Sequence, residues 1–161
     1  MAEPRLLRIP KSPLEVELAF AGQAPRRVEL YLAEHSSHDY SPERVLDLLE
    51  HAENFLPACD LESGEWESFN SRQVAWIGMP VESLDGAGAA TELFEQRRSV
   101  RVVLAGGDVL RGELLYTSPD ESSRVVDLMN RNERFFRLWT DDRVLLVNRE
   151  AVVRIHEEHG A

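Results

Sequence analysis

Residues 44–56, RVLDLLEHAENFL, and residues 124–136, RVVDLMNRNERFF, are two versions of one sequence pattern. Eight positions agree in identity or chemical type at a constant separation of 80 residues, counted from Arg44 to Arg124 (124 − 44 = 80). In both versions apolar residues first recur at helical spacing, and a phenylalanine then opens an apolar run. The stretch therefore predicts a short helix followed by a strand, present twice in the chain.

The match continues in the same order on both sides of this stretch. Upstream, residues 21–22 (Ala-Gly) correspond to residues 105–106, and downstream Asn70 corresponds to Asn148. The separation changes only where the loops differ in length, and loops are where insertions are tolerated. Ordered self-similarity of this kind indicates a duplicated supersecondary unit.

The apolar residues of each copy also follow the period of strands. Val16, Leu18 and Phe20 alternate with other residues, as expected of a half-buried strand. We expect strands at 16–20, 28–32, 54–59, 66–70 and 73–77 with a helix after Ser41 in the first copy, and strands at 100–104, 111–116, 134–140, 144–148 and 151–155 with a helix at 123–130 in the second. The fold class predicted is mainly β with short helices (α+β), as two tandem ββαβββ units.

Five short strands in one small unit cannot cover a core as a flat sheet, because both edges and one face would stay open. Curling into a small barrel, with the helix over one end, solves both problems. Units of this size are marginal alone, so we expect the two to pack together or share a sheet. The expected organisation is an N-terminal extension (1–13), a first unit (14–78), a linker with a short helix (79–97), a second unit (98–156) and a tail (157–161).

Composition describes a chain that folds in water. The 161 residues are 43% hydrophobic and 29% charged, outside the disordered range. The net charge is −11, which disfavours non-specific nucleic-acid binding, and residues 1–90 carry most of it (7 − 16 = −9). No long apolar run predicts a membrane span, the N-terminal residues are charged, and Cys59 is the single cysteine. We expect a cytoplasmic protein.

Residues 146–153, LVNREAVV, resemble the second signature segment of Sm-like small barrels, the family that includes bacterial Hfq. Residues 69–74, FNSRQV, are a weaker version. The helix at Arg124 followed by Phe135 and Phe136 is similar to a further group of bacterial Sm-like domains. The resemblance implies two small barrels, and it associates them with ring assembly and RNA binding. The chain departs from RNA-binding Sm proteins in its acidic charge and in having the helix between strands.

The sequence offers no catalytic or metal constellation. His35 and His38 lie beside Asp39 but lack the further ligands of a closed metal site, and they are interpreted as a solvated loop. Cys59 has no neighbouring basic residue to lower its pKa, so it is interpreted as an inert thiol. We therefore expect neither an enzyme nor a bound cofactor or metal.

Two groups of residues are candidate sites. Paired arginines near residue 97 resemble those with which PilZ domains bind cyclic di-GMP, although the rest of that motif is missing. The candidate ligand-binding set is Arg97, Arg98, Arg101, Arg111 and Arg149. The candidate interface set is Trp66, Phe69, Tyr116 and Trp139, because aromatic side chains that face outward anchor protein interfaces.

Two functions are compatible with these patterns. The first is a non-catalytic protein-interaction or assembly module of the bacterial cytoplasm, which binds another protein or itself and no membrane. The second is an RNA- or nucleotide-binding regulatory module that uses the arginines of the second unit. Arginines that converge on one concave surface would favour the second function, and arginines neutralised by acidic neighbours would favour the first.

Overall fold

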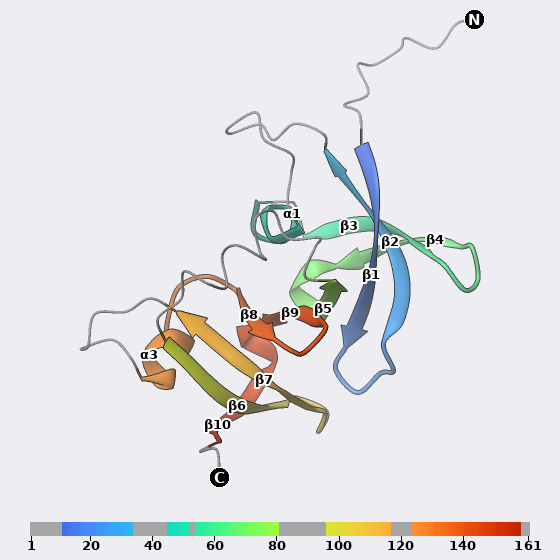
Figure 1. Ribbon diagram of the computed structural model, residues 1–161. Coiled ribbons are helices and arrows are strands. Elements are labelled where there is room, and N and C mark those ends of the chain that lie inside the picture. The colour runs from blue at the N-terminus through green and yellow to red at the C-terminus, as the bar shows by residue number, and fades with distance from the viewer. Residues whose placement is uncertain (1–10, 34–44, 52–53, 81–95, 117–123, 159–161) are drawn as a thin grey trace, which may run out of the picture.

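The computed structural model describes residues 11–33, 45–51, 54–80, 96–116 and 124–158 (Figure 1). Within these residues the chain is mainly β with two short α-helices, as the sequence predicts for the strand and helix content. The elements are β1 (Lys11–Phe20), β2 (Arg26–Ala33), α1 (Val45–His51), β3 (Phe55–Asp60), β4 (Trp66–Asn70), η1 (Ser71–Gln73), β5 (Val74–Pro80), β6 (Gln96–Leu104), β7 (Val109–Tyr116), α3 (Val125–Met129), β8 (Phe135–Trp139), β9 (Arg143–Asn148), η5 (Arg149–Ala151) and β10 (Val152–Glu157).

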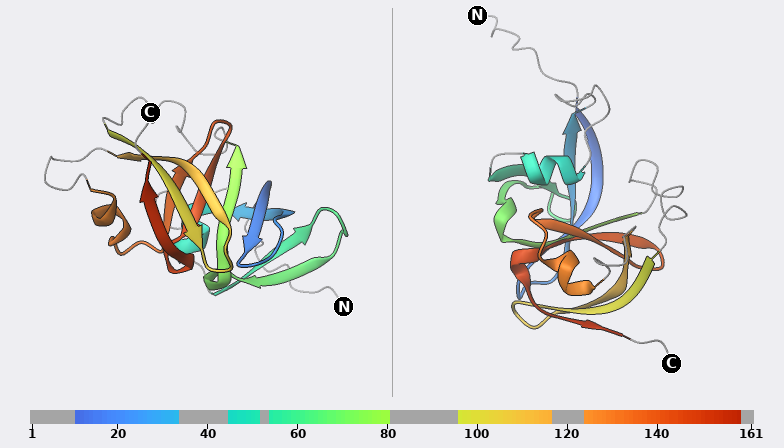
Figure 2. Two further views of the ribbon diagram at one scale, coloured as in Figure 1. Left: turned by 90° about the horizontal axis from the view of Figure 1, so that it is seen from below. Right: turned by 90° about the vertical axis from the view of Figure 1, so that its left-hand side faces the viewer.

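All ten strands belong to one antiparallel sheet in the order β10-β6-β7-β8-β9-β5-β1-β2-β3-β4. The centre of this order is the pairing of β5 with β9, which we call the joint, and it places Ile77 opposite Leu146. We call residues 11–80 the first half and residues 96–158 the second half. The sheet is strongly curved. In the first half β1 and β2 cross over β3, and in the second half β6 and β7 lie beside β10 (Figures 1 and 2).

Burial along the strands explains their sequence patterns. In β3 exposed Phe55 and Pro57 alternate with buried Leu56 and Ala58, because the strand has one covered face. Every residue of β5 before Pro80 is buried, and so is every residue of β9 after Arg143. These two strands are covered on both faces, which is why they are continuous apolar runs rather than alternating ones.

The hydrophobic core extends across the joint. One cluster contains most of the buried hydrophobic residues of the first half. It also includes Phe135, Trp139, Val144 and Leu146 of the second half. The other cluster contains most of the buried hydrophobic residues of the second half, together with Ala19, Ala75 and Trp76 of the first half. Each half therefore completes its core with side chains of the other.

The two helices are short and bury one face. In α3 the buried residues are Val125 and Leu128, and Arg124 at the N-cap forms an ion pair with Asp127 at 3.1 Å. The predicted cap Ser41 lies outside the described residues, as does Ser123. No helix in the described ranges is long and apolar enough to cross a membrane.

Two hairpin turns touch each other beside the joint. Gly22 in the β1–β2 turn and Gly106 in the β6–β7 turn have φ angles of 72° and 92°, which favour glycine. A Cβ on Gly106 would lie 2.7 Å from the backbone nitrogen of Gly22. Glycine at position 106 is therefore required both by the turn and by the contact between the halves.

Asn148 ties the halves together by hydrogen bonds. Its buried side-chain amide donates to the carbonyl oxygens of Arg72 at 3.1 Å and Val74 at 2.8 Å in the first half. Its Oδ1 accepts from the backbone N–H of Glu150, which caps the turn η5. Asn70 caps the turn η1 in the same way, by accepting from the backbone N–H of Arg72. Of the two capping bonds and the two bonds that the Asn148 amide donates, the donated bonds are the ones that join the two halves.

Replacing Asn148 with aspartate tests this cross-link. Asn148→Asp keeps the cap but removes the donor and places a carboxylate against two carbonyl oxygens. A buried polar group left without its partner costs about 1–3 kcal/mol and a charged one costs more, so the free energy of unfolding should fall by at least about 2 kcal/mol. Urea denaturation followed by tryptophan fluorescence measures it.

The matched control is Asn70→Asp, which keeps the equivalent cap at a half-buried position. It should change the free energy of unfolding by less than about 0.5 kcal/mol. Equal losses in the two variants would show that the amide of Asn148 does not bind the halves together.

Candidate interaction surfaces at the two ends of the sheet

The edge of β4 has backbone groups that no strand of the sheet pairs. Hydrogen bonds at either end of the β3–β4 ladder run from Asp60 N to Glu65 O (2.8 Å) and from Ser71 N to Asn54 O (2.7 Å). Bonded and non-bonded pairs alternate along an antiparallel ladder. The residues whose N–H and C=O groups point away from β3 are therefore Trp66, Ser68 and Asn70.

The opposite end of the sheet is the edge of β10. Glu158 N donates to Ser99 O at 2.7 Å, which fixes the alternation of the β6–β10 ladder. Because bonded and non-bonded pairs alternate, Glu157 and Ile155 are in non-bonded pairs with β6. Their backbone N–H and C=O groups therefore point away from β6. The two open edges lie on opposite sides of the molecule (Figure 1).

Exposed hydrophobic side chains accompany both edges. At the β4 end of the sheet, Phe55 on β3 and Trp66 on β4 are exposed. At the β10 end, Val153 on β10 is exposed, and so is Val126 on α3, the helix of the same half. Open edges that carry apolar side chains are sites where another strand can add to a sheet. These residues define the β4 surface (Phe55, Trp66) and the β10 surface (Val126, Val153).

The indole of Trp66 is held in place on the sheet. It stacks on the ring of Tyr31, with centroids 5.1 Å apart and an interplanar angle of 21°. The hydroxyl of Tyr31 donates to the carboxylate of Glu29 at 2.7 Å. The aromatic face is thus ordered before any partner arrives, which lowers the entropy lost on binding.

The four candidate interface residues are not equivalent in the structure. Trp66 is exposed, whereas Phe69 and Trp139 are buried on the inward face of their strands. The side chain of Tyr116, at the end of β7, lies outside the described residues. Phe55, which the sequence analysis did not select, occupies the outward face because it is out of phase with Leu56.

Three of the five candidate arginines form ion pairs with glutamates. Arg97 pairs with Glu113 at 3.6 Å, Arg98 with Glu157 at 3.3 Å and Arg111 with Glu158 at 3.4 Å. Exposed pairs of this kind add little stability, but they cancel the positive charge that a phosphate backbone would need. Arg97 and Arg111 do line one shallow hollow, where Glu113, Asp141 and Glu158 also lie.

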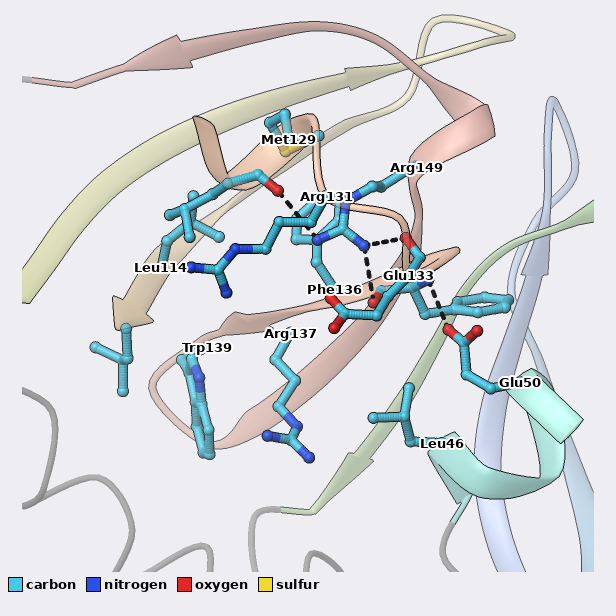
Figure 3. Close-up of a pocket in the computed structure, with 13 residues that line it drawn as sticks. Leu46, Glu50, Leu114, Met129, Arg131, Glu133, Phe136, Arg137, Trp139 and Arg149 are labelled. Carbon is cyan, nitrogen blue, oxygen red and sulfur yellow. Dashed lines mark hydrogen bonds between the residues drawn. The ribbon is translucent and has the colours of Figure 1, made fainter. Parts of the chain in front are cut away.

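The other two arginines are placed differently. Arg101 on β6 lies opposite His156 and has a buried Nε without a hydrogen-bond partner among the described residues. Arg149 is separate from the other four and donates to the carbonyl oxygens of Leu128 and Phe135 (Figure 3). The structure therefore does not bring the five arginines to one site.

Metal and thiol chemistry have no assembled site in the described part of the chain. No group of three or more His, Cys, Asp or Glu residues there could hold a metal ion. His35 and His38 lie outside the described residues. Cys59 is partly buried, and its thiol lies 3.8 Å from the carbonyl oxygens of Asp60 and Gly64.

No protein-family model matches the chain, and neither a curated protein nor a solved structure matches it significantly.

The aromatic stack makes a prediction about alkaline titration. The hydrogen bond to Glu29 stabilises the neutral phenol and raises the pKa of Tyr31 from 10.0 to about 12. Because the folded pKa exceeds the unfolded one, the stability linked to this group is complete below pH 10 and is lost as the pH rises towards 12. Absorbance at 295 nm, with Tyr31→Phe as the subtraction control, follows the phenolate. Glu29→Gln should return the midpoint towards 10.0, and an unchanged midpoint would contradict the assignment.

Proposed function

We propose that the chain is a non-catalytic assembly module of the cytoplasm, built from two Sm-like small barrels, which joins to further copies of itself end to end. One observation carries this proposal. Hydrophobic residues exposed at the two ends of the sheet correspond, through the internal repeat, to residues that are buried or partly buried beside the joint.

Recurrent backbone hydrogen bonds support the two-unit interpretation. The bond from Asp60 N to Glu65 O has its counterpart from Thr140 N to Arg143 O, at 2.8 and 2.9 Å. The bond from Ser71 N to Asn54 O likewise has a counterpart from Arg149 N to Arg134 O, both at 2.7 Å. The order of strands is also the same in the two halves. The first half has β5-β1-β2-β3-β4 and the second has β10-β6-β7-β8-β9, so in each the fifth strand lies beside the first.

This equivalence gives the open edges a defined partner. The joint pairs the fifth strand of the first unit with the fourth strand of the second, β5 with β9. The counterparts of these strands are β10 and β4, the two that are open. Ile77 lies opposite Leu146 at the joint, and their counterparts are Ile155 (77 + 78) and Ser68 (146 − 78). Both counterparts direct their backbone groups outward, so β10 of one copy can pair with β4 of the next in the register of the joint.

The β4 surface matches the surface that the second unit buries at the joint. Phe55 is 63% exposed, while its counterpart Phe135 is 3% exposed in the shared core beside α1. Trp66 is 65% exposed and its counterpart Val144 is fully buried. Phe135 also receives a cross-joint contact, because its backbone N–H donates to the carboxylate of Glu50 at 3.0 Å.

The β10 surface matches the surface that the first unit buries at the joint. Val153 is 63% exposed, whereas its counterpart Ala75 is 1% exposed. Val126 is 51% exposed, and its counterpart Leu46 packs against the core cluster that contains Phe135. Covering these side chains removes apolar area from water, which is the main driving force for association.

The proposed contact is more polar than the joint. Glu67 and Ser68 of β4 stand where β9 has Leu145 and Leu146. Polar side chains on an edge strand weaken its pairing and prevent uncontrolled aggregation. The contact joins two different surfaces, so it is heterologous and generates a closed ring or an open filament. We therefore expect assembly that depends on protein concentration.

Sedimentation velocity of the full chain tests the proposal. The native protein should form species larger than a monomer as its concentration rises. Phe55→Asp on the β4 surface and Val126→Asp on the β10 surface should each remain monomeric. A mixture of the two should form 1:1 dimers and nothing larger, because each variant keeps the surface that the other lacks.

Two controls make the experiment specific. Val109→Asp adds the same charge at an exposed valine that corresponds to no buried joint residue, and it should assemble like the native chain. Ser68→Pro removes an outward N–H from β4 and should prevent assembly, whereas Ser68→Ala should not. A native chain that stays monomeric up to millimolar concentration would refute end-to-end assembly.

A further inference from the structure

A cavity of about 340 Å³ lies between α1, α3 and β8 (Figure 3). Its volume is within the range of small-molecule sites, roughly 300–1,000 Å³. Its lining combines apolar side chains with three guanidinium groups. The apolar lining includes Leu46, Leu114, Leu128, Met129, Phe136 and Trp139, and the arginines are Arg131, Arg137 and Arg149.

One wall of the cavity is fixed by Arg149. Its guanidinium donates to the carbonyl oxygen of Phe135 at 3.1 Å, to that of Leu128 at 3.2 Å and to that of Glu133. It also lies 5.3 Å from the centre of the Phe136 ring, in cation–π geometry. These contacts connect the end of α3, the following loop and the start of β8, so the wall is ordered without a ligand.

The charge of the lining favours an anion. Three arginines face two glutamates, and Glu50 already accepts a hydrogen bond from the backbone N–H of Phe135. Burial lowers the pKa of Arg149, the carboxylates of Glu133 and Glu50 oppose that effect, and the charge of Arg131 adds to it. The described residues place no carboxylate in an ion pair with Arg131, whose charge repels that of Arg149.

The first copy of the repeated unit has no arginine at the corresponding positions. Through the repeat, the counterparts of Arg131 and Arg137 are His51 (131 − 80) and Pro57 (137 − 80), and Ser71 (149 − 78) is the counterpart of Arg149. The turn η1 is built with Ser71 and has the same Asn cap as η5, so the turn itself has no need of a guanidinium. The arginines are therefore a property of this cavity rather than of the repeated unit.

We propose that the cavity binds a small amphipathic anion, with a carboxylate or phosphate head beside Arg131 and Arg137 and an apolar body against Leu114 and Trp139. Guanidinium groups bind both kinds of head through paired hydrogen bonds. Leu46 and Glu50 come from the first half and the other lining residues from the second, so the ligand contacts both. This proposal does not depend on end-to-end assembly.

Titration of the full chain with decanoate, decyl phosphate and decyltrimethylammonium, each below its micellar concentration, tests the proposal. Isothermal calorimetry gives the affinity, and the indole N–H signal of Trp139 in nitrogen-15 NMR reports the location. We expect saturable binding of at least one anion with a shift of that signal, and at least tenfold weaker binding of the cation. The stronger of the two anions identifies the head group.

The double variant Arg131→Gln/Arg137→Gln should weaken anion binding at least tenfold, while Arg131→Lys/Arg137→Lys should keep most of it. The control Arg27→Gln/Arg154→Gln makes the same charge change at exposed positions outside the cavity. Equal binding of anion and cation, or equal affinity in the Gln and control variants, would overturn the proposal. Absence of saturable binding by either anion would also overturn it. Loss of assembly in the Phe55→Asp variant leaves this result unaffected, so the two proposals fail separately.

Discussion

The pairing of β5 with β9 is the interaction on which the rest of the structure depends. Both strands are buried on both faces, and each provides apolar side chains to the core of the other half. The contact of the two glycine turns and the side-chain bonds of Asn148 reinforce this one pairing. In the part of the chain that the structure describes, ten short strands thereby become one sheet that ends at β4 and β10, and the proposed function is based on what these two edges expose.

Local features of the fold and the packing of the two units on each other were predictable from the sequence, whereas the identity of the two strands that pair at the joint was not. Alternation located most strands to within three residues, because the period of two follows directly from which face is covered. β1 begins at Lys11, five residues before the predicted residue 16, and Ser12, Pro13 and Glu15 in this part are exposed, so no apolar alternation marks it. β6 begins at Gln96, earlier than the predicted residue 100, since its first residues pair with β7 at the surface, where burial leaves no strong apolar pattern. Alternation specifies a face of a strand and not its neighbour, so the pairing of residues 74–80 with 143–148 had no local signal.

The candidate site was predictable in the same limited way. Aromatic residues were identified on strands, but the sequence does not show which of them face outward. Phe55 is exposed and the next residue, Leu56, is buried, and this assignment of faces depends on where the core lies. The arginines near residue 97 proved to be paired with glutamates of neighbouring strands and of the chain beyond β10. Arg131 and Arg137 could not be selected from the sequence, because their cavity includes α1 from the other half.

The sharing of the core has a consequence for synthesis on the ribosome. β5 is complete at Pro80, but the strand that covers its outer edge ends only at Asn148, and a translating ribosome adds about 5–20 residues per second. For several seconds the nascent chain therefore carries an apolar strand whose partner does not yet exist. Its first half also lacks Phe135, Val144 and Leu146 during this interval. Chains emerging side by side on one messenger RNA could pair β5 with a neighbour's β9, which makes domain exchange the characteristic misfolding hazard of this architecture.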